Sequence, residues 1–189
     1  VYAEKFVKGV LKITTPKEIG NAINKIVDAE IGIIAVKDQS TVKSDQYRDF
    51  SYRTNEDRIK LRQQILKELV TLPRLDRDDN LKLGHGGAKP KTEVKKDKNI
   101  FIIIGLPAAG KSQIANDIAD KYGAYIVDTD YATRKFPEFR NNNFGANIVH
   151  DEAKNILWGD PGLFDYCLTE ACNIVFPTVG YNWERIKKY

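Results

Sequence analysis

Residues 100–130 read IFIIIGLPAAGKSQIANDIADKYGAYIVDTD and decide the fold that we expect for this chain. The first five residues form a continuous apolar run, which is typical of a strand covered on both faces in a parallel sheet. Apolar residues then recur at helical spacing, and Gly123 follows the last of them: Ile114, Ala115, Ile118, Ala119 and Tyr122. The segment therefore predicts a strand, a loop, a helix and a second strand at residues 124–127.

The loop between the first strand and the helix, GLPAAGKS at residues 105–112, matches the pattern G-x-x-x-x-G-K-[ST]. Its glycines permit backbone torsions that turn successive N–H groups inward, where the start of the helix attracts a polyphosphate. Lys111 is expected to reach the β- and γ-phosphates of ATP, and Ser112 to bind Mg²⁺. The predicted nucleotide-binding residues are Gly105, Pro107, Ala108, Ala109, Gly110, Lys111, Ser112 and Gln113.

Two carboxylates, Asp128 and Asp130, follow the second strand. The carboxyl ends of parallel strands border the ligand crevice, and we expect this strand to lie next to the first one. A carboxylate there can accept the proton of an attacking hydroxyl or hold magnesium through water. The alternative is that one of the two aspartates only caps the following helix.

The remainder of residues 99–189 alternates between helix and strand patterns. Helices are expected over residues 147–157 and 163–171, and a third strand over residues 173–176. Alternation of this kind predicts an α/β fold with a P-loop kinase-like parallel sheet and flanking helices. Three strands are few for such a sheet, and we expect the domain at residues 99–189 to be incomplete at its C-terminus.

Residues 1–75 predict a small, mainly helical N-terminal region. Thr15 and Glu18 form a capping box with Pro16 at the first helical position. IGIIAV at residues 31–36 predicts a strand, and Thr54 opens a further helix. Residues 76–98 contain three glycines and many lysines with little periodicity, which predicts a linker or surface loop.

Composition excludes several classes of protein. The 189 residues carry a formal net charge of +4 and contain no apolar run near the roughly 18 residues that cross a membrane. Two cysteines and two histidines do not support a disulfide framework or a structural zinc site, so a reducing cytoplasm is the expected location. The basic linker has no aromatic residue, so the sequence does not favour a nucleic-acid partner.

Three segments together resemble the zeta toxin family of bacterial kinases: GLPAAGKS, DTDYATRKFPEF from Asp128, and GANIVHDEA from Gly145. The resemblance covers roughly residues 99–180. It implies a P-loop kinase fold that uses ATP and Mg²⁺ to phosphorylate the 3′-hydroxyl of UDP-N-acetylglucosamine. The implied partners are thus a nucleoside triphosphate and a nucleotide-sugar acceptor.

The resemblance also assigns roles by position. Asp130 corresponds to the general base, and Asp128 lies beside it as a metal-orienting carboxylate. Glu152 corresponds to the acid that holds the substrate near its reacting hydroxyl. Arg134 is expected to approach the diphosphate, and Thr178 to keep a hydroxyl at the end of the third strand.

Two departures from the family pattern bear on activity. Pro177 stands near the position where the family commonly has an acidic residue. The family's arginine-bearing lid follows the third strand. Without the lid arginines, we expect the protein to bind nucleotide but to transfer its phosphate slowly. The reason is that loss of one such donor typically raises the activation free energy by about 3 kcal/mol or more.

The sequence leaves two alternatives to the nucleotide-sugar kinase. One is a kinase for another hydroxyl, such as that of an antibiotic, a nucleoside or a polynucleotide end. The other is a nucleotide-binding toxin–antitoxin module, in which residues 1–75 inhibit the site in cis or an antitoxin covers it.

Overall fold

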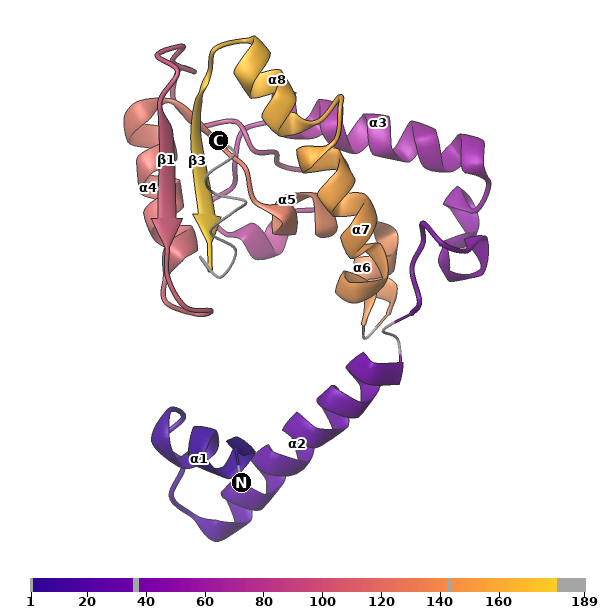
Figure 1. The fold of residues 1–189 in the computed structure, drawn as a ribbon, viewed down its shortest axis with the longest axis vertical. Coiled ribbons are helices and arrows are strands. Elements are labelled where there is room, and N and C mark those ends of the chain that lie inside the picture. Colours follow the sequence, from indigo (N-terminus) through magenta and orange to yellow (C-terminus); the bar gives the residue numbers. More distant parts are fainter. Residues whose placement is uncertain (1, 36–37, 143, 180–189) are drawn as a thin grey trace. The chain divides into compact units, whose positions relative to one another are not determined.

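The computed structural model describes residues 2–35, 38–142 and 144–179 (Figure 1). The chain divides into two compact units, Val1–Gln39 and Ser40–Tyr189. The boundary thus falls after residue 39 rather than after residue 75. The physical reason is that the helix of residues 55–71 contributes fully buried side chains to the core that contains the sheet, namely Leu61, Ile65 and Leu69.

The described residues of the first unit form the helices α1 (Tyr2–Gly9) and α2 (Pro16–Ala35). Helix α2 begins at Pro16 as predicted, and the Thr15 hydroxyl donates to the Glu18 carboxylate within its first turn. The strand predicted at residues 31–36 is wrong for residues 31–35, which continue α2; residue 36 lies outside the described residues. A short apolar run does not by itself distinguish helix from strand, and here it extends an established helical repeat.

In the part that the structure describes, the second unit contains three strands among helices. Its first long helix is α3 (Asn55–Thr71), for which Thr54 is the predicted N-cap: its side chain accepts from the Asp57 N–H. None of the helices in the described residues is long and apolar enough to cross a membrane. The elements after α3 are η3 (Asp78–Asn80), β1 (Ile100–Ile104), α4 (Lys111–Tyr122), β2 (Ala124–Ile126), α5 (Thr129–Thr133), α6 (Pro137–Asn141), α7 (Gly145–Trp158), α8 (Leu163–Thr169) and β3 (Asn173–Thr178); the short helices η1 (Asp45–Tyr47) and η2 (Phe50–Tyr52) precede α3.

The three strands form one parallel sheet in the order β1-β3-β2. The unit is therefore a mixed α/β structure with a small parallel sheet and flanking helices, as the alternation of patterns predicts. The expectation that β2 lies next to β1 is wrong, because β3 pairs with both. All three strands still run in the same direction, so their carboxyl ends lie at the same end of the sheet.

The strand β1 is an edge strand in the described residues, and it is not covered on both faces as its composition predicts. Its side chains alternate in exposure, and Ile102 and Ile104 are 40% and 56% exposed. Helix α4 packs against all three strands, and Figure 1 shows it beside β1. Trp158 at the end of α7 lies with its ring 4.9 Å from that of Phe176 on β3.

The segment at residues 76–98 is part of the second unit and packs into its core, so it is not a free linker. Leu81 and Ala88 are fully buried. The Ala88 carbonyl accepts from the Ile126 N–H at 2.9 Å, which ties the segment to β2. The buried Lys135 ammonium donates to the Gly86 carbonyl at 2.5 Å and to the Glu68 carboxylate at 2.7 Å.

Gly87 provides a test of this packing. A Cβ at this position would lie 2.3 Å from both the Glu68 and Leu72 carbonyl oxygens at the end of α3. We therefore expect Gly87→Ala to lower the free energy of unfolding by about 2 kcal/mol, measured by urea denaturation. Lys82→Ala, an exposed change in the same segment, should alter it by less than about 0.5 kcal/mol. Equal stability of the two variants would contradict the close packing of this segment.

Candidate functional site

The predicted phosphate loop connects the end of β1 to the start of α4, as expected. Gly110, the N-cap of α4, has φ +78°, a left-handed conformation that glycine adopts without strain. Among the described residues, no side chain caps this helix, because its N-cap Gly110 has no side chain. The loop closes on itself through the Ala109 N–H, which donates to the Leu106 carbonyl at 3.2 Å. A 12-residue helix with an uncapped N-terminus thus follows directly on a tight loop.

The loop borders a hollow of about 570 Å³ at the carboxyl ends of the strands. This volume lies within the range of ordinary small-molecule sites. The hollow contains both predicted aspartates as well as the loop lysine and serine. Its lining residues are Pro107, Ala108, Ala109, Gly110, Lys111, Ser112, Asp128, Asp130, Pro177, Thr178 and Val179.

The structure brings most of the predicted site residues together. Thr178 closes β3 beside the loop, since its carbonyl accepts from the Gly105 N–H at 3.2 Å. Gly105 itself and Gln113 do not line the hollow. The Gln113 amide instead donates to Asp117 at 3.1 Å along α4.

The Lys111 side chain is turned back onto its own loop. Its ammonium donates to the Leu106 carbonyl at 2.6 Å. A loop carbonyl is a single neutral acceptor, whereas a triphosphate offers several charged oxygens to the same donor. Lys111 can therefore exchange this bond for a stronger one to a bound phosphate within the same hollow.

The two aspartates differ in their surroundings. Asp128 is half-buried and is the N-cap of α5, where its carboxylate accepts from the Asp130 N–H at 3.1 Å. Burial raises the pKa of Asp128 to about 6, and the neighbouring charge of Asp130 adds to the rise; the hydrogen bond from the Asp130 N–H opposes both. Asp130 is exposed at the first turn of α5. The alternative role as a helix cap thus applies to Asp128, whereas the Asp130 carboxylate is open to the hollow.

The raised pKa of Asp128 has a measurable consequence for stability. Because its folded pKa of about 6 exceeds the ordinary aspartate value of 3.8, the folded state binds the proton more tightly, and stability falls as pH rises from about 4 to 6. We expect Asp128→Asn, which keeps the cap, to raise the free energy of unfolding at pH 7.5 by about 1–2 kcal/mol. Urea denaturation of the variant and the wild type at pH 4.5 and 7.5 measures this difference in the free energy of unfolding. Identical pH dependence in the variant and the wild type would contradict the assignment; Asp165→Asn, an exposed change in α8, is the control.

Arg134 does not line the hollow. Its guanidinium donates to the Asp79 carboxylate at 3.0 Å and lies 5.5 Å from the Phe139 ring centroid. The segment before β1 thus provides its partner, an arrangement that sequence spacing did not indicate. In this structure Arg134 holds that segment and does not contact the space where phosphate would bind.

Glu152 is also placed away from the hollow. It is 1% exposed, and one carboxylate oxygen accepts from Arg58 at 2.5 and 2.8 Å and from the Thr41 hydroxyl at 2.6 Å. The carboxylate therefore stabilises the packing of α3 against α7. The substrate-holding role that the resemblance implies is not available to Glu152 in this arrangement.

Sequence reasoning missed the buried cluster around Arg58, which also bonds Glu138 on α6 at 2.7 Å. Its members are scattered over about half of the chain, and no short motif connects them. The only local signal is an arginine on the apolar side of α3, three residues before the buried Leu61. Such a signal predicts burial but does not identify the partners.

Comparison with protein-family models, curated proteins and solved structures found no match to this chain. Within the described residues, no group of three or more histidine, cysteine, aspartate or glutamate side chains is arranged to hold a metal ion. A hard cation in the hollow would therefore need oxygen ligands beyond such a group, such as the Ser112 hydroxyl and phosphate oxygens.

Proposed function

We propose that this chain is an ATP- and Mg²⁺-dependent phosphotransferase that acts on a hydroxyl group, with a nucleotide sugar such as UDP-N-acetylglucosamine as acceptor. One observation carries the proposal: the uncapped start of α4, Lys111 and the exposed carboxylate of Asp130 border a single hollow. Phosphate binding and proton removal require these groups on the same side of a sheet.

The residues of the hollow divide the work between binding and proton transfer. The loop amides and Lys111 bind the phosphates of ATP, and Asp130 accepts the proton of the acceptor hydroxyl. The hydroxyl oxygen forms a bond to the γ-phosphorus as the bond to the β–γ bridging oxygen breaks, and ADP leaves. Ser112 and Asp128 offer oxygen ligands of the kind that Mg²⁺ prefers, and the bound ion supplies neutralisation of the phosphate charge.

The choice of acceptor rests on the resemblance to the zeta toxin family. Arg134 and Glu152, the two residues that the resemblance assigns to the acceptor, are engaged with Asp79 and Arg58. The geometry supports phosphotransfer to a hydroxyl, and the resemblance supports the nucleotide sugar. An acceptor must therefore be recognised by other residues around the hollow, such as Thr178 and Val179.

Inhibition in cis by residues 1–75 is not supported, because these residues do not form a unit separate from the sheet. Helix α3 supplies part of the core of the sheet unit, so deletion of these residues would expose that core. A deletion confined to residues 1–39 respects the boundary between the units and tests inhibition by the first unit alone.

Mass spectrometry of UDP-N-acetylglucosamine incubated with the full chain, ATP and Mg²⁺ tests the proposal. We expect a product that carries one additional phosphoryl group, formed only when ATP and Mg²⁺ are both present. Lys111→Met should abolish this product, because the principal cation of the phosphate site is removed. Phosphorylation of a different alcohol would overturn the nucleotide-sugar acceptor alone, whereas failure to bind ATP would overturn the kinase.

A further inference from the structure

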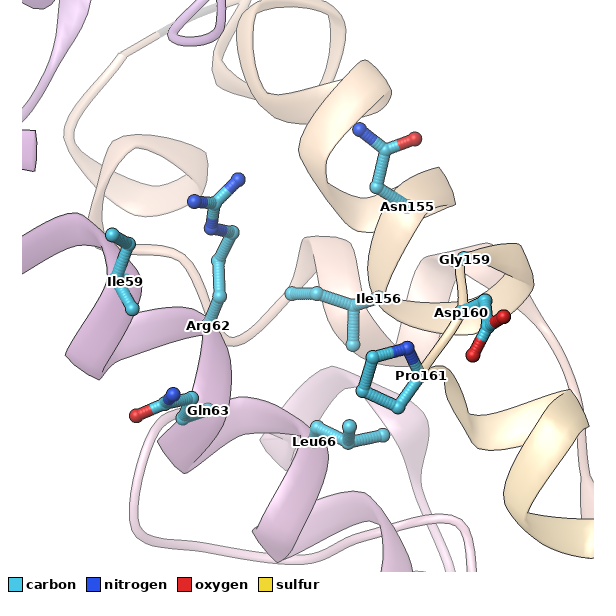
Figure 2. A pocket seen from close by; sticks show the side chains of 9 residues that line it. All are labelled: Ile59, Arg62, Gln63, Leu66, Asn155, Ile156, Gly159, Asp160 and Pro161. Carbon is cyan, nitrogen blue, oxygen red and sulfur yellow. The ribbon is translucent and has the colours of Figure 1, made fainter.

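A second hollow lies between α3 and α7, apart from the one that contains the phosphate loop. It has a volume of about 380 Å³ and shares no lining residue with the first hollow. Four of its residues come from one face of α3, at intervals of three and four positions, and the rest from the end of α7 and the turn after it. They are Ile59, Arg62, Gln63, Leu66, Asn155, Ile156, Gly159, Asp160 and Pro161 (Figure 2).

The floor of this hollow is apolar and its rim is polar. Ile156 is 5% exposed, and its side chain extends toward α3, with Leu66 and Pro161 nearby (Figure 2). Arg62 reaches from α3 on the side of Asn155 (Figure 2). The combination of an apolar floor and a few polar groups is typical of sites for small amphipathic molecules.

Arg62 makes one long ion pair, with the buried Glu152, and no side-chain hydrogen bond of its guanidinium is formed within the described residues. Its side chain is 37% exposed, and its Nε lies 3.9 Å from the nearer oxygen of Glu152, beyond hydrogen-bond distance. The other oxygen of Glu152 already accepts two bonds from Arg58. The guanidinium of Arg62 therefore retains donors for a ligand, and a guanidinium matches the planar pair of oxygens of a carboxylate.

The other charged residue of the lining does not favour a cationic ligand at the same place. The carboxylate of Asp160 is directed away from the Arg62 guanidinium (Figure 2). The amide side chains of Gln63 and Asn155 make no hydrogen bond to other described residues and can accept or donate to a ligand. The hollow is thus complementary to an apolar body that ends in one negative charge.

We propose that this hollow is a binding site for a small amphipathic carboxylate, whose apolar body covers Ile156 and Leu66 and whose carboxylate pairs with Arg62. The site is independent of the nucleotide hollow. It makes the α3–α7 face of the protein a second ligand site on this chain.

Titration of the full chain with hexanoate, followed by the amide NMR signals of Ile156 and Gly159, tests the site. We expect saturable shifts with a dissociation constant on the order of 1 mM, as suits a ligand of this size. Arg62→Gln should weaken hexanoate binding at least about tenfold, because it removes the charge-assisted pair. Hexylammonium should produce no saturable shift at these amides.

Two further variants separate loss of the site from loss of the fold. Asn155→Asp places a negative charge at an exposed position of the rim and should also weaken hexanoate binding. Arg77→Gln removes an exposed arginine outside the hollow and should leave the affinity unchanged. The proposal is overturned if hexanoate shifts neither amide, if hexylammonium binds equally well, or if Asn155→Asp in a folded protein binds hexanoate as the wild type does.

Discussion

Replacement of Asp130 by asparagine is expected to lower the rate of phosphoryl transfer by about 10²–10⁴-fold. Asp130 is the exposed member of the aspartate pair and lines the hollow with Lys111 and Ser112. Asparagine has nearly the same size but no basic oxygen, so the acceptor hydroxyl keeps its proton during attack. The affinity for ATP should remain nearly unchanged, because the backbone amides of the loop and Lys111 are retained.

Single-turnover measurement of product and calorimetric titration with ATP separate these two quantities. Asp165→Asn, in α8, removes an exposed carboxylate that does not line the hollow and should affect neither. If Asp130→Asn weakened ATP binding as much as it slowed transfer, Asp130 would be a structural or metal-holding residue rather than the base. Full activity of the variant would remove it from the mechanism.

Replacement of Arg58 by methionine is expected to lower the free energy of unfolding by about 3–5 kcal/mol. Arg58 is 1% exposed, donates to Glu138 at 2.7 Å and to Glu152 at 2.5 Å, and lies 4.8 Å from the Phe136 ring centroid. Methionine fills much of the same space but leaves two buried carboxylates without their cation. The second oxygen of Glu138 is buried and lacks a hydrogen-bond partner among the described residues, so this carboxylate depends on the bonds to its other oxygen, of which Arg58 donates one.

Urea denaturation of single and combined variants distinguishes this charge effect from lost packing. When Arg58→Met is combined with Glu138→Gln and Glu152→Gln, the loss should be smaller than that of Arg58→Met alone, because no unpaired buried charge remains. A loss below about 1 kcal/mol for Arg58→Met would show that the carboxylates find other partners, such as Arg62.

The sequence predicted the elements whose information is local. The apolar run at residues 100–104, the loop at residues 105–112 and the cap at Thr54 each lie where expected. Capping, loop torsions and helical periodicity depend on residues within one or two turns of each other, and they can be read from spacing. The same is true of the shared hollow, because parallel strands place the residues after them at one edge.

The sequence did not indicate which elements contact one another. Glu152 and Arg134 follow apparently functional patterns, yet the first pairs with Arg58 and the second with Asp79, both far away along the chain. Residues 76–98 have the composition of a linker, yet their backbone fits between α3 and β2 because Gly87 has no side chain.

Local patterns in this chain thus determined the loop at residues 105–112, the helices α3, α4 and α7, and the parallel direction of the strands. Only the tertiary structure decided the strand order, the position of the unit boundary and the burial of Glu152. The physical reason is that desolvation and pairing of a charge depend on side chains brought together from distant segments, and such encounters leave no regular spacing in the sequence.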